Sequence, residues 1–157
     1  ETPQITMEEV DLYQLDAESL ESLSGKASQK QISLHLKGEP ALLKGNRALL
    51  SSVIYNLCDN AITYNQSKGG VFVTINKTDQ KVVLEVKDTG IGIPKDEGDR
   101  IFERFYRVDK SRSKKVGGTG LGLSIVKHAL KCHGASIQVD SQIGKGTRMI
   151  VTFPVEK

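Results

Sequence analysis

The sequence predicts an α+β domain, a two-layer sandwich in which a mixed β-sheet is covered on one face by helices. Three observations predict this fold: apolar residues recur at helical spacing in some segments, they alternate at strand spacing in others, and short turns join most neighbours. The chain has 157 residues, of which 38% are hydrophobic and 26% charged. This length and composition are typical of one globular domain with a single core.

The first part of the chain predicts one helix and two strands. Residues 1–15 form a leading segment whose apolar side chains can dock on a core. We expect a helix from Asp16 to Lys30, with Asp16 as its N-cap, because apolar residues recur there every three or four positions. Alternation over 32–37 predicts a half-buried strand, and a short second strand is expected at 42–43.

The middle of the chain carries the strongest helical pattern and a hairpin. The helix starts near Asn46 and presents a broad apolar face. Alternation at 71–75 and 82–86 then predicts two neighbouring strands, joined by a turn at 78–80. Residues 88–120 are polar and rich in glycine, which is typical of a functional lid or a disordered linker.

The last part predicts a helix and two strands. The helix runs from Gly120 to Gly134, and a glycine is a natural C-terminal stop. Strands are expected at 136–139 and 147–153, with two glycines in the turn between them.

Composition argues against several functions. The net charge is only +3, and the cluster of basic residues at 104–115 has no aromatic platform on which bases could stack, so nucleic acid is not an expected partner. Cys58 and Cys132 lie in apolar helical patterns without a C-x-x-C pair, so we expect buried free thiols. No apolar run reaches the ~20 residues that span a bilayer. Because the chain starts at Glu1 rather than Met, we expect an excised fragment.

A glycine-rich segment from Gly117 to Gly122 directly precedes a predicted helix. Backbone amides at a helix N-terminus bind phosphate. The dinucleotide-binding fingerprint does not fit, because the charged residues 111–116 cannot be the buried strand that it requires. A P-loop at Gly144 does not fit either, because Gly146 stands where Ser or Thr is needed. A flexible loop that caps a helix is the alternative.

Two amides, Asn56 and Asn60, lie four residues apart and therefore on one face of the predicted helix. A buried amide without a partner costs ~1–3 kcal/mol, so both side chains need partners. An asparagine carbonyl oxygen is a hard ligand that suits hydrated Mg²⁺. Hydrogen bonds to neighbouring backbone are the alternative.

Asp88 stands at the end of a predicted strand and is followed by Gly90 and Gly92. A carboxylate there can accept a hydrogen bond from an exocyclic amine, while glycine lets the backbone approach closely. A turn-initiating aspartate is the alternative.

Four segments of the chain resemble conserved boxes of the histidine-kinase-like ATPases and occur in the same order as in that family. This group also holds the type II topoisomerase, Hsp90 and MutL ATPase domains. Residues 56–65 resemble the N box, 88–94 the first glycine box (D-x-G-x-G) and 118–123 the second (G-T-G-L-G-L). Residues 102–109, F-E-R-F-Y-R-V-D, resemble the F box that marks sensor histidine kinases. The resemblance covers essentially the whole chain.

The resemblance implies that residues 1–157 are the catalytic and ATP-binding domain of a sensor histidine kinase, with a long mobile ATP lid at about 95–118. The implied ligands are ATP and Mg²⁺. No H-E-x-x-x-P-type box occurs, so none of the three histidines is expected to be the phospho-acceptor. The implied partners are the histidine-bearing dimerisation domain of the same parent protein and a response regulator downstream. We expect a cytoplasmic domain without membrane contact of its own, in a membrane-anchored parent.

The resemblance also implies a role for individual residues. Asn60 would coordinate Mg²⁺, and Asn56 would orient the transfer beside it. Asp88 would accept from the adenine amine, and Arg107 would reach the terminal phosphates, so that positioning and charge neutralisation are both supplied. The other implied ATP contacts are Tyr64, Gly90, Gly92, Tyr106, Gly118, Thr119, Gly120, Leu121 and Gly122.

The chain departs from the family pattern at Thr63. The family commonly carries Lys there, in N-x-x-x-N-A-x-K-Y, and that lysine is usually a phosphate contact. Thr63 keeps a hydroxyl but loses a charge. Basic residues of the lid could compensate: Lys110, Arg112, Lys114 and Lys115.

Other functions in the same superfamily fit less well. A serine kinase of the anti-sigma-factor type or a topoisomerase-type ATPase would carry a glutamate base in the N box, where Asn56 stands. A nucleotide sensor that has lost kinase activity is favoured by Thr63 alone.

Overall fold

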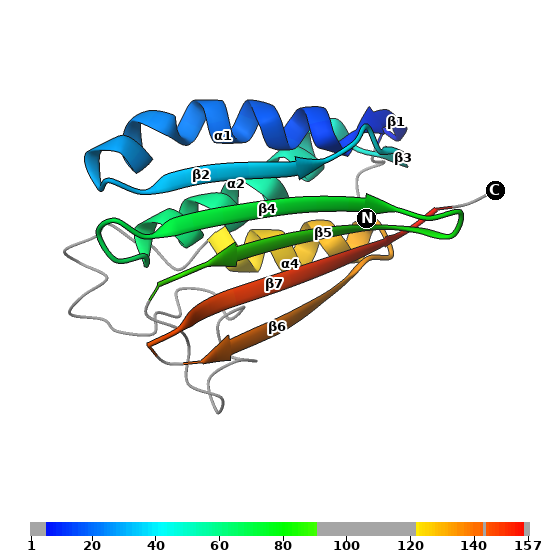
Figure 1. Cartoon of the computed structure of the whole chain (residues 1–157). Helices are drawn as coiled ribbons and strands as arrows, with labels where there is room; N and C mark the ends of the chain where they lie inside the picture. Colours follow the sequence, from blue (N-terminus) through cyan, green and yellow to red (C-terminus); the bar gives the residue numbers. More distant parts are fainter. Residues whose placement is uncertain (1–5, 91–121, 143, 156–157) are drawn as a thin grey trace.

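The structure, a computed structural model, describes residues 6–90, 122–142 and 144–155, in which helices cover one face of a five-stranded sheet (Figure 1). This confirms the predicted α+β sandwich. The predicted lid lies outside the described residues. The elements are β1 (Glu8–Asp11), α1 (Leu12–Gln29), β2 (Ser33–Gly38), β3 (Leu42–Gly45), α2 (Arg47–Thr63), β4 (Gly70–Lys77), β5 (Lys81–Asp88), α4 (Gly122–Cys132), β6 (Ser136–Gln142) and β7 (Gly146–Pro154).

The main sheet has the strand order β2-β4-β5-β7-β6. β2 and β4 are parallel, because the chain passes through β3 and α2 between them, and the other neighbours are antiparallel. The register places Asp88, the last residue of β5, between Val71 of β4 and Thr147 of β7. β1 and β3 pair separately as a two-stranded antiparallel sheet, so the leading segment contains a strand that the sequence did not predict.

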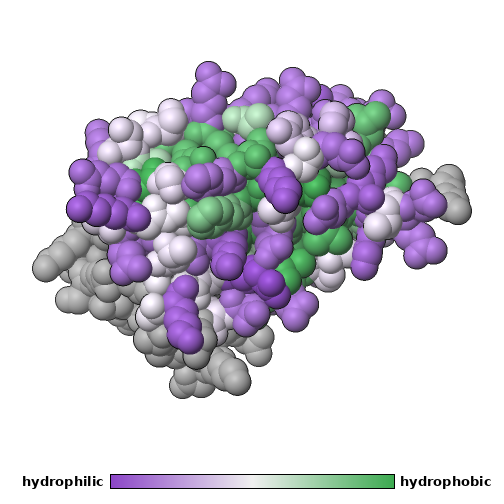
Figure 2. Space-filling model, in the orientation of Figure 1, coloured by the Kyte–Doolittle hydropathy of each residue, from purple (hydrophilic) through white to green (hydrophobic). Residues whose placement is uncertain are grey.

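Alternation along the central strands separates a buried face from an open one. Val71, Val73 and Ile75 point into the core and are almost fully buried, whereas Phe72 between them is 38% exposed. Figure 2, in the orientation of Figure 1, shows hydrophobic groups among hydrophilic side chains on the molecular surface. α2 packs against β4 and β5, and α4 packs against β6. The strand predicted from alternation at 71–75 is therefore confirmed.

The start of α1 corrects a prediction. Its N-cap is Asp11, not Asp16, because the Asp11 Oδ1 atom accepts hydrogen bonds from the backbone N–H groups of Tyr13 (3.1 Å) and Ala41 (3.0 Å). Asp11 thus begins the helix and also joins it to the residue before β3. Asp16 lies in the second turn of the helix and is fully buried.

α2 begins as predicted, with Asn46 as its N-cap. The Asn46 side chain accepts from the Leu49 N–H (3.0 Å), and the Asn46 N–H donates to Nε2 of His133 (3.0 Å). The other ring nitrogen of His133 lies 2.7 Å from the Ala129 carbonyl, which can only accept, so Nδ1 carries the proton. His133 therefore joins the end of α4 to the start of α2.

The two cysteines differ in exposure. Both are free thiols, but only Cys58 is buried. The expectation of a buried Cys132 is wrong, because Cys132 is the last residue of α4 and is partly exposed to solvent.

None of the described helices is long and apolar enough to cross a membrane.

Asp16 is the one buried carboxylate of the described core whose oxygens both lack a hydrogen-bond partner. Burial raises its pKa well above the ordinary value, because the charged form is poorly solvated there. Burial also raises the pKa of the nearby Cys58 thiol, with smaller contributions from Asp16 and Asp59, so Cys58 stays protonated and unreactive.

Asp16 should make the domain less stable as the pH rises. The unfolded chain ionises Asp16 near pH ~3.9, whereas the folded chain holds the proton to higher pH, so the stabilisation present below pH ~4 is lost above it. Relative to an Asp16→Asn variant, the unfolding free energy of the wild type should fall by up to about 1.4 kcal/mol per pH unit in urea titrations between pH 4 and 8.

Asp79→Asn is the matched control, because Asp79 is exposed in the turn between β4 and β5. It should leave the pH dependence unchanged. A constant difference between the wild type and Asp16→Asn across this range would contradict the assignment.

Candidate functional site

Asp88 is held rigidly at the end of β5. Its Oδ1 atom accepts hydrogen bonds from the N–H of Gly90 (2.8 Å) and from the N–H of Thr147 on β7 (3.2 Å). Burial raises the pKa of the carboxyl to about 6, although these two hydrogen bonds act in the opposite direction. At neutral pH the group is mainly a carboxylate. Its Oδ2 atom has no hydrogen bond to another described residue and is available to a donor.

The first glycine box packs directly on the end of α2. A Cβ atom at Gly90 would lie 2.5 Å from the Tyr64 carbonyl oxygen and 2.9 Å from Asp88 Oδ1, so only glycine fits. Gly146 is similarly constrained, because its φ is +111° and its Cα faces the Asp88 backbone. The structure therefore brings the predicted site residues Tyr64, Asp88 and Gly90 together.

A buried amide that the sequence did not single out for a role fixes this junction. Asn65 is 1% exposed; its side chain donates to the Gly70 carbonyl (3.0 Å) and accepts from the Gln66 N–H (2.8 Å). The Thr89 hydroxyl lies between Asn65 Oδ1 (3.3 Å) and the Gly70 N–H (2.9 Å). These bonds join the residues after α2 to the residue after Asp88. An asparagine two residues after the end of a predicted helix was the only signal in the sequence.

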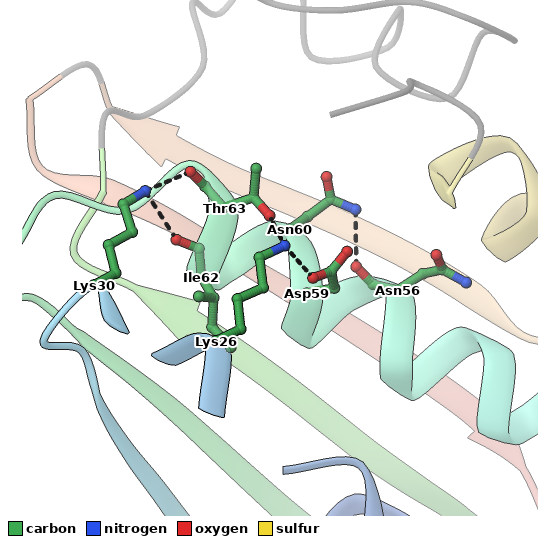
Figure 3. A network of polar contacts seen from close by, with 7 residues as sticks. All are labelled: Lys26, Lys30, Asn56, Asp59, Asn60, Ile62 and Thr63. Carbon is green, nitrogen blue, oxygen red and sulfur yellow. Dashed lines mark hydrogen bonds and ion pairs between the residues drawn. The ribbon is translucent and has the colours of Figure 1, made fainter. Parts of the chain in front are cut away.

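Asn56 and Asn60 lie on the same side of α2, as predicted (Figure 3). Each is half-buried and donates its amide back to a helix carbonyl: Asn56 to Ser52 (2.7 Å) and Asn60 to Asn56 (2.8 Å). These are the backbone hydrogen bonds of the alternative interpretation. They satisfy the amide nitrogens only, and neither Oδ1 atom has a hydrogen bond to another described residue.

The donor set on α2 fits Mg²⁺. Mg²⁺ keeps several waters and binds through one or two protein oxygens together with substrate phosphates. The two Oδ1 atoms are hard oxygen ligands one helical turn apart, so they match this pattern. A site built from three or more His, Cys, Asp or Glu residues is absent from the described part of the chain.

Two lysines, Lys26 of α1 and Lys30 just after it, reach the C-terminal end of α2, and no pattern in the sequence predicted them. Lys26 Nζ donates to Asp59 Oδ1 (2.6 Å) and to Thr63 Oγ1 (2.6 Å). Lys30 Nζ donates to the carbonyl oxygens of Ile62 (3.2 Å) and Thr63 (2.6 Å). Figure 3 shows both ammonium groups at the last turn of α2.

Several predicted site residues lie outside the described residues: Gly92, Tyr106, Arg107, Gly118, Thr119, Gly120 and Leu121. The basic residues of the lid lie outside them too. Gly122 is the first residue of α4.

A pocket of about 280 Å³ is lined by residues of β5, β6 and β7 and of the turn between β6 and β7. Asp88 and Lys145 line this pocket, but Asn56 and Asn60 do not. It is therefore not the predicted nucleotide site.

Comparison with known proteins gives a family and several relatives. Residues 45–157 match the model of the histidine kinase-, DNA gyrase B-, and HSP90-like ATPases. The chain is 38% identical to the sensor-like histidine kinase SenX3 of Mycolicibacterium smegmatis over 94% of this chain and 39% of that protein. It is 43% identical to the sensor histidine kinase WalK of Bacillus subtilis over 69% of this chain and 18% of that protein. It thus spans well under half the length of these curated relatives.

Solved structures agree with the sequence comparison. The mycobacterial sensor histidine kinase MprB superposes with a TM-score of 0.83 at 30% identity, covering 95% of this chain and 97% of that chain. The nucleotide-free catalytic domain of histidine kinase ThkA also gives 0.83, at 26% identity, over 96% and 98%. The chain therefore belongs to the histidine kinase-, DNA gyrase B-, and HSP90-like ATPase family, and within it matches the catalytic domains of sensor histidine kinases.

Proposed function

We propose that this chain binds ATP with Mg²⁺ and transfers the γ-phosphoryl group to a histidine on a dimerisation domain outside these 157 residues. All of residues 1–157 would form the catalytic and ATP-binding domain, with a lid at about 95–118. The phosphoryl group would then pass to a response regulator. The parent protein would be membrane-anchored, with this domain in the cytoplasm.

The fixed Asp88 carboxylate is the observation that carries the proposal. Because two backbone N–H groups occupy Oδ1, only Oδ2 can accept from a ligand. A free carboxylate oxygen selects the 6-amino group of adenine over the 6-carbonyl oxygen of guanine. Gly90 lies beside this carboxylate and the backbone carbonyl of Tyr64 lies against Gly90, so a base here would be flanked by backbone without a Cβ atom and by the residue that ends α2.

The phosphates would lie along α2, toward Asn60 and then Asn56. Mg²⁺, when bound, would neutralise phosphate charge and fix the geometry of transfer. Asn60 would hold the ion through Oδ1, and Asn56 would orient the reacting groups beside it. Arg107 would add a cation from the lid. Phosphoryl transfer depends mainly on positioning and charge neutralisation, and these residues offer both.

Relatives support this function at the level of the family. ShkA, which is 26% identical with a TM-score of 0.83, has been solved in complex with AMPPNP. ThkA, besides its isolated catalytic domain, has been solved in complex with the response regulator protein TrrA. We propose the corresponding nucleotide and partner class for this chain.

An Asp88→Asn variant should lose ATP affinity by about tenfold or more in calorimetric titration. Both backbone donors require an oxygen at the Oδ1 position, so the new NH₂ group must take the Oδ2 position and would face the adenine amine, donor against donor. Wild-type affinity should rise when Mg²⁺ is added.

Asp79→Asn removes the same charge at the opposite end of the β4–β5 hairpin and should bind ATP like the wild type. Equal ATP affinity in Asp88→Asn and the wild type would contradict the role of Asp88. A folded wild-type chain that does not bind ATP at all would contradict the proposed function.

Adenosine binding should weaken as the pH falls through about 6. Protonation of Asp88 removes the acceptor, and with a pKa of about 6 the affinity should drop about tenfold between pH 7 and pH 5. Adenosine is the appropriate ligand because it has no phosphate that titrates in this range. Asp16→Asn should show the same profile, since the other carboxyl with a raised pKa is not in the site. An adenosine affinity that is constant over this range would exclude Asp88 as the acceptor.

A further inference from the structure

The ammonium group of Lys26 has one N–H donor that its hydrogen bonds to described residues do not use. An ammonium group has three N–H donors. Two of them bind Asp59 and Thr63, and within the part of the chain that the structure describes the third has no partner. The side chain is 41% exposed, so a ligand can reach it.

The position of this ammonium relates it to the predicted phosphate site. Asn56, Asn60 and Thr63 are spaced four and then three residues apart, so they follow one face of α2. Lys26 Nζ lies 2.6 Å from the hydroxyl of Thr63, the last member of this row. A positive charge from α1 therefore lies beside Thr63, the residue at which the family pattern has a lysine (Figure 3).

Helix stabilisation alone does not require both lysines. α2 has no basic residue in its last turn, and a cation at a helix C-terminus is stabilising. Lys30 meets this need directly, because it donates hydrogen bonds to two carbonyl oxygens at that end of the helix. Lys26 bonds to side chains instead, and one of them, Asp59, is the neighbour of Asn60 in sequence.

From these contacts we infer that Lys26 is a nucleotide-binding residue that supplies, from α1, the phosphate-facing positive charge missing at position 63. The inference rests on the proposed ATP-binding function. Asp59 and Thr63 orient the ammonium, and the third N–H donates to a phosphate oxygen. The ammonium does not have to leave Asp59 to do so.

The test compares ATP with adenosine on the folded chain. Lys26→Gln should weaken ATP binding about 3- to 10-fold, which is the range for one partly exposed charge-assisted hydrogen bond, and should leave adenosine binding unchanged. The readout is calorimetric titration of both ligands with Mg²⁺ present. Lys30→Gln is the matched control; it removes an equal charge from the C-cap of the same helix and should not change the ratio of ATP to adenosine affinity.

Thr63→Lys added to Lys26→Gln should restore ATP affinity, because it places an ammonium on α2 itself. If the double variant does not fold, as judged by thermal melting, the ATP-to-adenosine ratio of Lys26→Gln alone decides. An unchanged ratio in that variant, with wild-type ATP binding intact, would overturn the inference and leave the proposed function standing. Absence of ATP binding in the wild type would contradict the proposed function itself.

Discussion

The site depends on how the Asp88 carboxylate is held by backbone amides of two segments that are 57 residues apart in sequence, Gly90 and Thr147. Neither donor is a side chain, so the orientation of the carboxylate follows from the pairing of β5 with β7 and from the turn after β5. Gly146 contributes through its lack of a side chain, because a Cβ there would collide with the Asp88 carbonyl. The raised pKa shows that burial outweighs the two hydrogen bonds. The group is therefore poorly solvated and gains from a donor on its free oxygen.

The helix α2 serves both the core and the site, and its neighbours fix it at both ends. Its buried face includes Leu50, Ile54 and Leu57, while Asn56 and Asn60 lie half-buried beside that face. At the N-terminus, the imidazole of His133, the residue after α4, accepts from the Asn46 N–H. At the C-terminus, Lys26 of α1 donates to side chains of α2, and Lys30, the C-cap of α1, donates to its carbonyls. A helix tied in this way holds its two amides at fixed positions relative to Asp88.

Local patterns in the sequence were sufficient for much of this structure. Alternation predicted the strands around Val73 and Leu84, because one face of the sheet is covered and the other is open. Helical periodicity placed the start of α2 at Asn46, where the cap bonds to a residue three positions on. The spacing of Asn56 and Asn60 and the position of Asp88 at a strand end were also readable without tertiary information.

What the sequence did not predict depends on contacts between distant segments. Asp11 and Asp16 are equally good caps by local rules, and Asp11 is chosen because it also accepts from Ala41, thirty residues away. The pairing of Lys26 with Thr63 spans 37 residues and exists only because α1 packs on α2. The lid cations that could compensate for the lysine missing at position 63 lie outside the described residues, so that expectation stays a prediction. The structure presents a cation from another helix, which no periodicity could indicate.

The most direct test of the account is a crystal structure of this chain with Mg²⁺ and AMPPNP. The account predicts the adenine amine within hydrogen-bond distance of Asp88 Oδ2, with the phosphates beside Asn60 and Mg²⁺ coordinated by its Oδ1. A base whose amine lies out of hydrogen-bond reach of Asp88 Oδ2 would contradict it.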